Sequence, residues 1–267
     1  MEPVCRIAAP DCGRLEHSAT LLNKGKHMNI IVLNHAPNVG KTTIAQHLLR
    51  PRMKDAELFC IKAVTSAHHE RPGEKETETA DHFDELMKKI RNCHLSIIDV
   101  DAEETGNFIR HAISSGRSGI SLDRFMLPVT KEPETVTHTI NTIRVLSKSG
   151  IEHDRIAVVF NRIEEEDLEE DFEAVISLGK GGNAIFVDTA CSVFENEIFG
   201  TLKTQDSCLL AMTEDKTDYR ELLRHTDRTD EKTRLDLSRK LILKRLAHSA
   251  THNLDFVYMR LAPGRFL

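Results

Sequence analysis

From Met28 onward, short apolar runs alternate with helix-length amphipathic segments, and this alternation constrains the fold more than any other feature of the chain. A strand, a helix and a second strand in succession form a βαβ unit, whose two strands lie parallel in one sheet. The runs are continuously apolar, as expected for strands that helices cover on both faces. We therefore predict an α/β fold with a doubly wound, mostly parallel sheet.

The element boundaries follow from the same pattern. In the segment that starts near residue 132, Thr130 is the expected N-cap, Pro133 lies in the first turn and Gly150 ends the helix. The polar stretch 66–76 is expected to be a mobile loop. The predicted strands are 28–34, 57–64, 95–100, 124–129, 155–160 and 184–188. The predicted helices are 41–50, 75–91, 102–115, 132–149 and 165–178.

Composition defines the class of protein but not its partners. The 36 basic and 42 acidic residues give a net charge of −6, which argues against a general nucleic-acid coat. By position, however, residues 164–173 hold eight carboxylates and no base, whereas residues 232–267 hold eight Lys or Arg against two Asp. The six cysteines form no CxxC pair, which fits reduced thiols in a cytoplasm. Neither a signal peptide nor a membrane span is predicted, and side chains alone predict no metal site.

The segment from Asn34 to Thr43, NHAPNVGKTT, follows the first strand and leads into the helical segment IAQHLL. A strand, loop and helix of this kind present backbone N–H groups and a helix N-terminus to a phosphate group. Gly40 lets the backbone approach closely, Lys41 can neutralise β/γ oxygens, and Thr42 can ligate Mg²⁺. The first glycine of the GxxxxGK[ST] pattern is replaced by His35. The predicted phosphate-binding residues are Pro37, Asn38, Val39, Gly40, Lys41, Thr42 and Thr43.

Two further strand ends carry candidate site residues. Asp99 ends the strand 95–100, where a carboxylate can hold the Mg²⁺ shell or its water, although it can equally be a turn residue, and Asp101 is an alternative. Asn161 and Arg162 follow the strand 155–160, where the Asn161 amide can pair with an adenine edge.

The segments MNIIVLNHAPNVGKTTIAQHLLRPRM, SIIDVD, FMLPVTKEPETVTHTINTIRVLSKSGI and IAVVFNRI together resemble the StbB-type plasmid stability proteins, a branch of the ParA/MinD-like ATPases. The resemblance covers about residues 28–205. It implies a bacterial cytoplasmic protein, with nucleoid association, that binds ATP and Mg²⁺ and helps to maintain or transfer a plasmid together with a DNA-binding partner. It also implies that Lys41 and Asp99 serve catalysis, Thr42 and Asp99 hold Mg²⁺, and Asn161 contacts adenine.

The chain departs from the ParA pattern at two points. The signature lysine, which reaches across a nucleotide-sandwich dimer, aligns with Ala36. The acid that positions the attacking water after the second strand has no counterpart in KAVTSAHH. Glu70, Glu74, Glu103 and Glu104 are candidate replacements, and each is also explained as a solvated acid. Because phosphoryl transfer depends on positioning and charge stabilisation, we expect slow hydrolysis.

The C-terminal region is predicted to be helical and charged. Residues 1–27 are expected to form a disordered tail, 28–213 a P-loop nucleotide-binding domain, and 214–267 a helical extension packed on that domain. In 231–247, a basic amphipathic helix can dock its apolar face on the sheet and offer its cations to DNA phosphates, to an anionic membrane or to solvent. The DNA-binding candidates are Arg239, Lys240, Lys244 and Arg245.

Three functions follow as hypotheses. The first is an ATP-dependent switch of a plasmid stability, partition or conjugation system, with slow hydrolysis. The second is a metabolic enzyme on the same fold, such as a carboxylate-activating ligase, and the third is a nucleotide-binding regulator without hydrolysis. The sequence leaves open whether the chain is a monomer or a homodimer.

Overall fold

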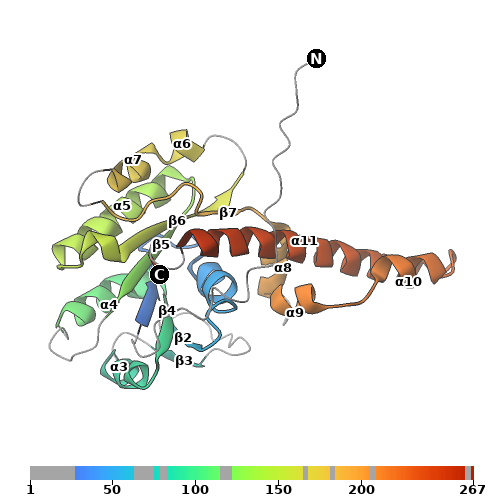
Figure 1. The fold of residues 1–267 in the computed structure, drawn as a ribbon, viewed down its shortest axis with the longest axis horizontal. Helices are drawn as coiled ribbons and strands as arrows, with labels where there is room; N and C mark the ends of the chain where they lie inside the picture. Colours follow the sequence, from blue (N-terminus) through green and yellow to red (C-terminus); the bar gives the residue numbers. More distant parts are fainter. Residues whose placement is uncertain are drawn as a thin grey trace, which may run out of the picture.

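A computed structural model describes residues 28–62, 75–78, 83–114, 122–164, 168–180, 184–204, 209–261 and 266–267. It contains a parallel sheet with helices on both faces and a long C-terminal helix that extends beyond the sheet (Figure 1). The predicted disordered tail, 1–27, and most of the predicted loop 66–76 lie outside the described residues.

The sheet has seven strands in the order β3-β2-β4-β1-β5-β6-β7, and all described pairs are parallel. β1 lies in the middle, with β2 to β4 on one side and β5 to β7 on the other. This reversal of direction creates a switch point at the carboxyl end of β1, where α/β folds bind ligands. The strands are β1 (Met28–Val32), β2 (Ala56–Ile61), β3 (Lys75–Glu78), β4 (Leu95–Val100), β5 (Arg124–Val129), β6 (Ile156–Ile163) and β7 (Ser192–Phe194).

Two apolar layers enclose the sheet, because successive side chains of each strand point to opposite faces. Ile31 packs in the layer under α3, α4 and α5, whereas its neighbours Ile30 and Val32 pack in the layer under η3, α8 and α11. The helices are α2 (Lys41–Thr43), η3 (Ile44–Leu49, a π-helix), α3 (Phe83–Arg91), α4 (Ala102–Ser114), α5 (Pro133–Lys148), η5 (His153–Arg155), α6 (Leu168–Asp171), α7 (Glu173–Ile176), η6 (Ser177–Gly179), α8 (Glu197–Thr204), α9 (Leu209–Glu214), α10 (Tyr219–His225) and α11 (Glu231–Leu261).

A side chain of α11 closes the β7 edge of the sheet. The Asn253 amide donates to the Ser192 carbonyl at 2.9 Å and accepts from the Phe194 N–H at 2.9 Å. These backbone groups face away from β6, whose ladder uses the Cys191 carbonyl. Asn253 therefore occupies the hydrogen-bonding positions that an additional strand would use.

The predicted fold class is confirmed, and β4 and β5 have the predicted bounds. The predicted helix 75–91 is wrong in its first part, because residues 75–78 form β3 and the helix begins at Phe83. The predicted strand 184–188 is also wrong. It contributes only an isolated bridge at Phe186, and the edge strand is β7.

The remaining differences concern helix ends. The predicted helix 165–178 is broken into α6, α7 and η6 within the described part of that segment. Glu132, and not Thr130, is the residue before α5, while Thr130 contacts the Thr135 hydroxyl at 3.0 Å. Gly150 does end α5, with a φ of 85° that glycine adopts without strain. The helix α8 was not anticipated by the sequence pattern.

Candidate functional site

The loop after β1 has the tightly turned backbone that the sequence predicts. Asn38 has a φ of 57° and Gly40 a φ of 88°, both in the left-handed region. At Gly40 a Cβ atom would lie 2.0 Å from the Asn161 Nδ2 atom, so the position requires glycine for space as well as for conformation. The helix begins directly afterwards at Lys41, which leaves the N–H groups of its first turn outside the helical hydrogen-bond pattern.

Lys41 folds back over its own loop. Its Nζ donates to the Ala36 carbonyl at 2.9 Å, and the residue is only 6% exposed. Burial lowers the pKa of the Lys41 ammonium, while the Asp99 and Asp101 carboxylates act in the opposite direction. A buried ammonium of this kind gains most from an anion that enters the loop, because a phosphate would replace its lost hydration.

Asn34 anchors the start of the loop to two other elements. Its Nδ2 donates to the Pro128 carbonyl at 2.9 Å and to the Thr139 hydroxyl at 2.7 Å. Its Oδ1 accepts from the Ala36 N–H at 3.0 Å and from the Thr142 hydroxyl at 3.4 Å. Three of these bonds join the loop to β5 and α5, the bond from the Ala36 N–H lies within the loop, and together they satisfy a fully buried amide.

His35, which replaces the first glycine of the pattern, points towards α5 and α4. Its Nδ1 lies 2.9 Å from the Thr142 hydroxyl, and its Nε2 lies 3.7 Å from where a Cβ at Gly106 would be. Burial lowers the pKa of His35, and the charges of His138 and Lys41 add to this effect. The imidazole therefore packs beside the loop in its neutral form near pH 7.

Asp99 lies at the carboxyl end of β4, the strand next to β1. It pairs in register with Val32, so both residues reach the same edge of the sheet, and it is 7% exposed. The neighbouring α4 is joined to the loop, because the Thr105 hydroxyl shares its proton between the Asp101 carbonyl at 2.9 Å and the Asn34 carbonyl at 3.2 Å. The predicted carboxylate is therefore at the edge of the sheet from which the loop emerges.

Asn161 reaches the loop from the carboxyl end of β6. Its Nδ2 donates to the Val39 carbonyl at 2.8 Å, and the side chain is buried. Asn161 therefore binds the predicted phosphate-binding loop directly. The sequence predicted the loop and Asn161 as separate parts of the site and did not predict this bond. Arg162 follows with a φ of 56°, an uncommon value for a residue other than glycine.

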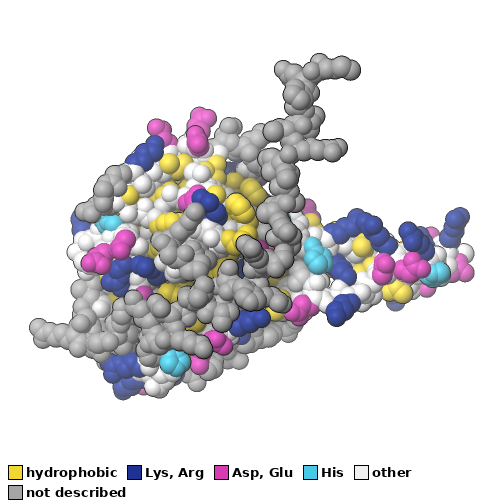
Figure 2. All heavy atoms as spheres, in the orientation of Figure 1, with side chains coloured by type: hydrophobic (Ala, Val, Ile, Leu, Met, Phe, Trp, Pro, Cys, Tyr) yellow, Lys and Arg dark blue, Asp and Glu magenta, His cyan; other side chains and the backbone are white. Residues whose placement is uncertain are grey.

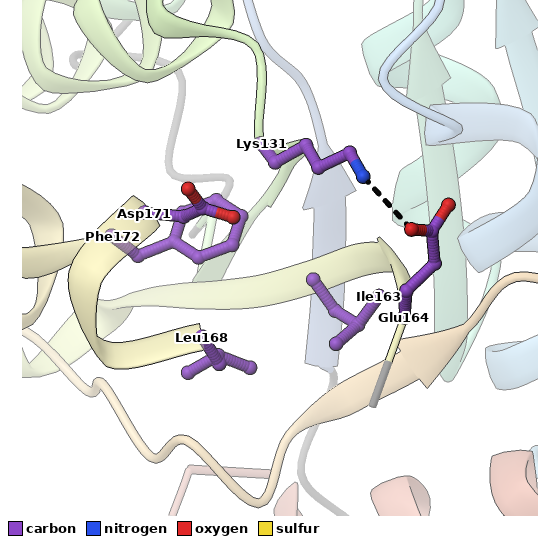
Figure 3. A pocket seen from close by; sticks show the side chains of 6 residues that line it. All are labelled: Lys131, Ile163, Glu164, Leu168, Asp171 and Phe172. Atoms are coloured by element: carbon purple, nitrogen blue, oxygen red, sulfur yellow. Dashed lines mark hydrogen bonds and ion pairs between the residues drawn. The ribbon is translucent and has the colours of Figure 1, made fainter. Parts of the chain in front are cut away.

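A small hollow lies where β5 and β6 end (Figure 3). Across it, Lys131 from the end of β5 donates to Glu164 from the end of β6 at 3.1 Å. Phe172 and Leu168 line the apolar side. The first residue of the acidic run is therefore engaged by a lysine, while residues 165–167 of that run lie outside the described part of the chain.

The candidate replacements for the missing water-positioning acid lie in different parts of the chain. Glu103 and Glu104 lie in the first turn of α4, where carboxylates suit the helix dipole. Glu70 and Glu74 lie outside the described residues. Ala36, at the position of the signature lysine, is fully buried.

The four DNA-binding candidates lie away from the loop, on the projecting part of α11, and they do not share one face. At about 100° per residue, Lys240 and Lys244 lie on one face, one turn apart, whereas Arg239 and Arg245 point away from it on either side. The Lys240 ammonium pairs with Asp236 at 2.9 Å. The expectation that the apolar residues of 231–247 dock on the sheet is wrong for Leu235 and Ile242, which are more than half exposed.

Sequence reasoning missed the residues that hold the loop from behind. Thr139 and Thr142 are buried on the inner face of α5, among Val136, Ile143 and Leu146. The available signal was their spacing, since hydroxyl residues at apolar positions of an amphipathic helix face inward and need partners.

Comparisons with known proteins support the fold. No family profile matches the sequence, and no curated protein matches it significantly. Among solved structures, the MinD cell division protein of Aquifex aeolicus matches with a TM-score of 0.53 and 12% identity, covering 88% of this chain and 96% of that one.

Two further structures are less similar. A plasmid partition protein described from Borrelia burgdorferi B31, bound to AMPPNP, matches with a TM-score of 0.48 and 10% identity, covering 89% of this chain and 100% of that one. Apo McdA from Cyanothece matches with a TM-score of 0.45 and 14% identity, covering 70% and 93%. At 12% identity the match to MinD shows a shared α/β fold. Within the described residues, no helix is both long and apolar enough to cross a membrane.

Proposed function

We propose that the chain binds ATP with Mg²⁺ at the loop 35–43 and works as a nucleotide-dependent switch in a plasmid stability, partition or transfer system. The observation that carries this proposal is the conformation of this loop. The buried Lys41 ammonium donates to the Ala36 carbonyl of the same loop and interacts with the Asp99 carboxylate. The solved structure of MinD has a similar fold.

The residues present fit a phosphate chain. The N–H groups of the first helical turn and the Lys41 ammonium supply positive charge, and Gly40 adds no side chain to the loop. Thr42 and Asp99 would hold Mg²⁺, which takes its remaining ligands from phosphate oxygens and water. When bound, the ion would neutralise charge on the phosphates. Asn161 holds the loop through Val39 and would also contact the base.

Slow turnover is part of the proposal. Ala36, which is buried, stands where ParA-like proteins have a lysine that reaches across the dimer. The segment KAVTSAHH contains no acid that could position the attacking water. Charge stabilisation at the γ-phosphate is therefore weaker, and phosphoryl transfer depends on such stabilisation. The same observations favour, as a second candidate, a regulator that binds the nucleotide without hydrolysing it.

The test is ATP affinity measured by calorimetry in the presence of Mg²⁺. Lys41→Ala should weaken binding about tenfold or more, because a charge-assisted contact with phosphate is removed. Lys148→Ala, which removes an exposed lysine at the end of α5, is the control and should leave the affinity unchanged. Equal affinities of wild type and Lys41→Ala, or no ATP binding by wild type, would refute the nucleotide site.

The partner is proposed to be a small DNA-binding protein, and the chain itself is proposed to contact DNA without sequence preference through 231–247. Binding of the full chain to a non-specific duplex should fall as salt rises, since each phosphate contact releases counterions. Replacing Arg239, Lys240, Lys244 and Arg245 together by Ala should abolish this binding. Unchanged binding by this variant would exclude the helix as the DNA contact.

A further inference from the structure

Helix α11 is divided between two environments. From Ala247 to Leu261 it is packed on the sheet, with Ala250, Leu254 and Val257 buried. Towards its N-terminus it projects away from the body together with α10 (Figure 1), and Leu243 and Leu246 are the first of its side chains to pack partly against the apolar layer under α11. We call residues 219–246 the arm. The segment of α11 within the arm runs from Glu231 to Leu246, which we call the arm helix, and is about 24 Å long at 1.5 Å per residue.

Contacts with α10 cover one side of the arm helix. The Arg234 guanidinium donates to the Leu223 carbonyl at 3.0 Å and to the Thr226 carbonyl at 3.2 Å. Lys244 donates to the Thr217 carbonyl at 2.9 Å and lies 5.8 Å from the centre of the Tyr219 ring. These contacts at both ends of α10 fix the arm as a defined pair of helices.

Another side of the arm helix exposes large apolar side chains. Leu235 and Ile242 are 53% and 54% exposed, and α10 adds Leu222 at 45%. Leu235 and Ile242 are seven residues apart, about two helical turns, so they lie along one line of the helix. This line continues through Leu246 to Ala250, which packs on the sheet. The apolar face thus extends beyond the body that covers its second half.

The two ends of the arm helix differ in net charge. Residues 230–236 hold three acids against Lys232 and Arg234, and the Arg234 guanidinium is turned to α10, whereas residues 239–245 hold four Lys or Arg and no acid. Figure 2 shows basic side chains along the whole arm and acidic ones mostly on its outer half. Two such helices placed antiparallel bring the acidic start of each alongside the basic stretch of the other. A parallel arrangement would place like charges together, which is unfavourable.

We propose that the arm is a self-association surface, on which the arm of a second copy of this chain packs antiparallel, with Leu235 against the partner's Ile242 and Ile242 against the partner's Leu235. The surface is self-complementary in both apolar pattern and charge, as a two-fold symmetric contact must be. DNA phosphates would contact the cations of this helix but offer the exposed leucine and isoleucine nothing to bury against, so the apolar line remains available for a second copy. The contact does not depend on a nucleotide, so it stands or fails separately from the proposed function.

The experiment measures the molar mass of the full chain by sedimentation equilibrium across a range of concentrations, without nucleotide and with Lys41→Ala as a second background. We expect a concentration-dependent dimer in both. The double variant Leu235→Glu/Ile242→Glu should be a monomer that retains wild-type circular dichroism, because both positions are exposed. Met259→Glu, which changes a 49% exposed residue in the body half of the same helix, is the matched control and should remain dimeric.

A charge exchange tests the antiparallel arrangement. Arg245→Glu should weaken the dimer at least several-fold, and Glu231→Arg in the same chain should restore it, since each new charge then faces its opposite on the partner. A monomeric wild type at all concentrations would overturn the proposal, even if it binds DNA. A dimer that survives Leu235→Glu/Ile242→Glu, or an Arg245→Glu dimer that Glu231→Arg does not restore, would overturn it equally.

Discussion

The two halves of α11 have similar amphipathic sequences and opposite environments. In the body half, leucine and valine are buried between the helix and the sheet, as at Leu254 and Val257. In the arm half, Leu235 and Ile242 face solvent, although they are seven residues apart, like the buried Leu254 and Leu261 of the body half. The apolar period of a helix therefore predicts which side chains share a face but not whether the chain itself supplies a surface to cover that face. The first two predictions below test this contrast and the contrast between Gly40, which Asn161 crowds, and Gly150, which has open space around it.

The largest difference is expected between equivalent truncations in the two halves. Leu254→Ala should lower the free energy of unfolding by about 2–5 kcal/mol, because it leaves a cavity in a fully buried layer. Ile242→Ala, at an exposed position, should change it by less than about 0.5 kcal/mol in the monomer. Urea unfolding at low protein concentration measures both. Similar losses would mean that the arm half is covered within the monomer.

Gly40 and Gly150, both in the left-handed region, should respond differently to alanine. Gly150→Ala introduces only backbone strain, about 1 kcal/mol, since nothing lies within 4 Å of the added Cβ. Gly40→Ala adds a clash with Asn161 Nδ2 and the loss of its bond to Val39, so we expect about 2–3 kcal/mol from chemical denaturation. Combining Gly40→Ala with Asn161→Ala should recover the part due to the clash. Equal effects of the two single variants would contradict the close approach of Asn161.

A smaller effect is expected at the closed edge of the sheet. Asn253→Ala removes two hydrogen bonds to β7 and should cost about 1–2 kcal/mol, measured as a lower Tm and urea midpoint. It also exposes strand groups that can pair with another chain, so light scattering on warming should start earlier. His252→Ala, at an exposed neighbouring position, serves as the control. A shift no larger than that of the control would show that the edge needs no cover.

The smallest effect concerns acid stability at the base of the arm. Hydrogen bonds from Thr217, followed by the Tyr219 hydroxyl, lower the pKa of Asp215 from 3.8 to about 2. A carboxyl with a lower pKa in the folded state stabilises that state above pH 3.8 and loses this contribution as the pH falls towards 2. Asp215→Asn should therefore flatten the fall in thermal stability between these pH values. Thr217→Ala should act in the same direction, and a profile identical to that of wild type would exclude the contribution.

Sequence reasoning recovered the parts of the fold that local pattern determines. β4 and β5 are continuous apolar runs between helices, and their bounds were predicted correctly. β3, with the polar sequence KETE, and β7, with three residues, are strands only because a neighbour pairs with them. Edge strands of this kind carry little apolar signal of their own.

The structure brings the candidate site residues to one edge of the sheet and shows contacts between them that the sequence did not predict. The loop and the strand ends at Asp99 and Asn161 lie together at one edge of the sheet, because parallel strands place their carboxyl ends there. The bond from Asn161 to Val39 joins residues 122 positions apart, and no local pattern encodes such a contact. The exposure of Leu235 and Ile242 could not be predicted from the local sequence either, because it depends on how far the sheet and its covering helices extend along α11.

The buried Asn34 amide has a mechanical consequence. It is bonded at once to the Ala36 N–H, the Pro128 carbonyl and the hydroxyls of Thr139 and Thr142. A slide of α5 along its axis by a single residue would break the two hydroxyl contacts and release the bond that sets the loop backbone. The loop and α5 therefore move as one body or lose these bonds, and a ligand that stiffens the loop also restrains the far end of a helix 16 residues long.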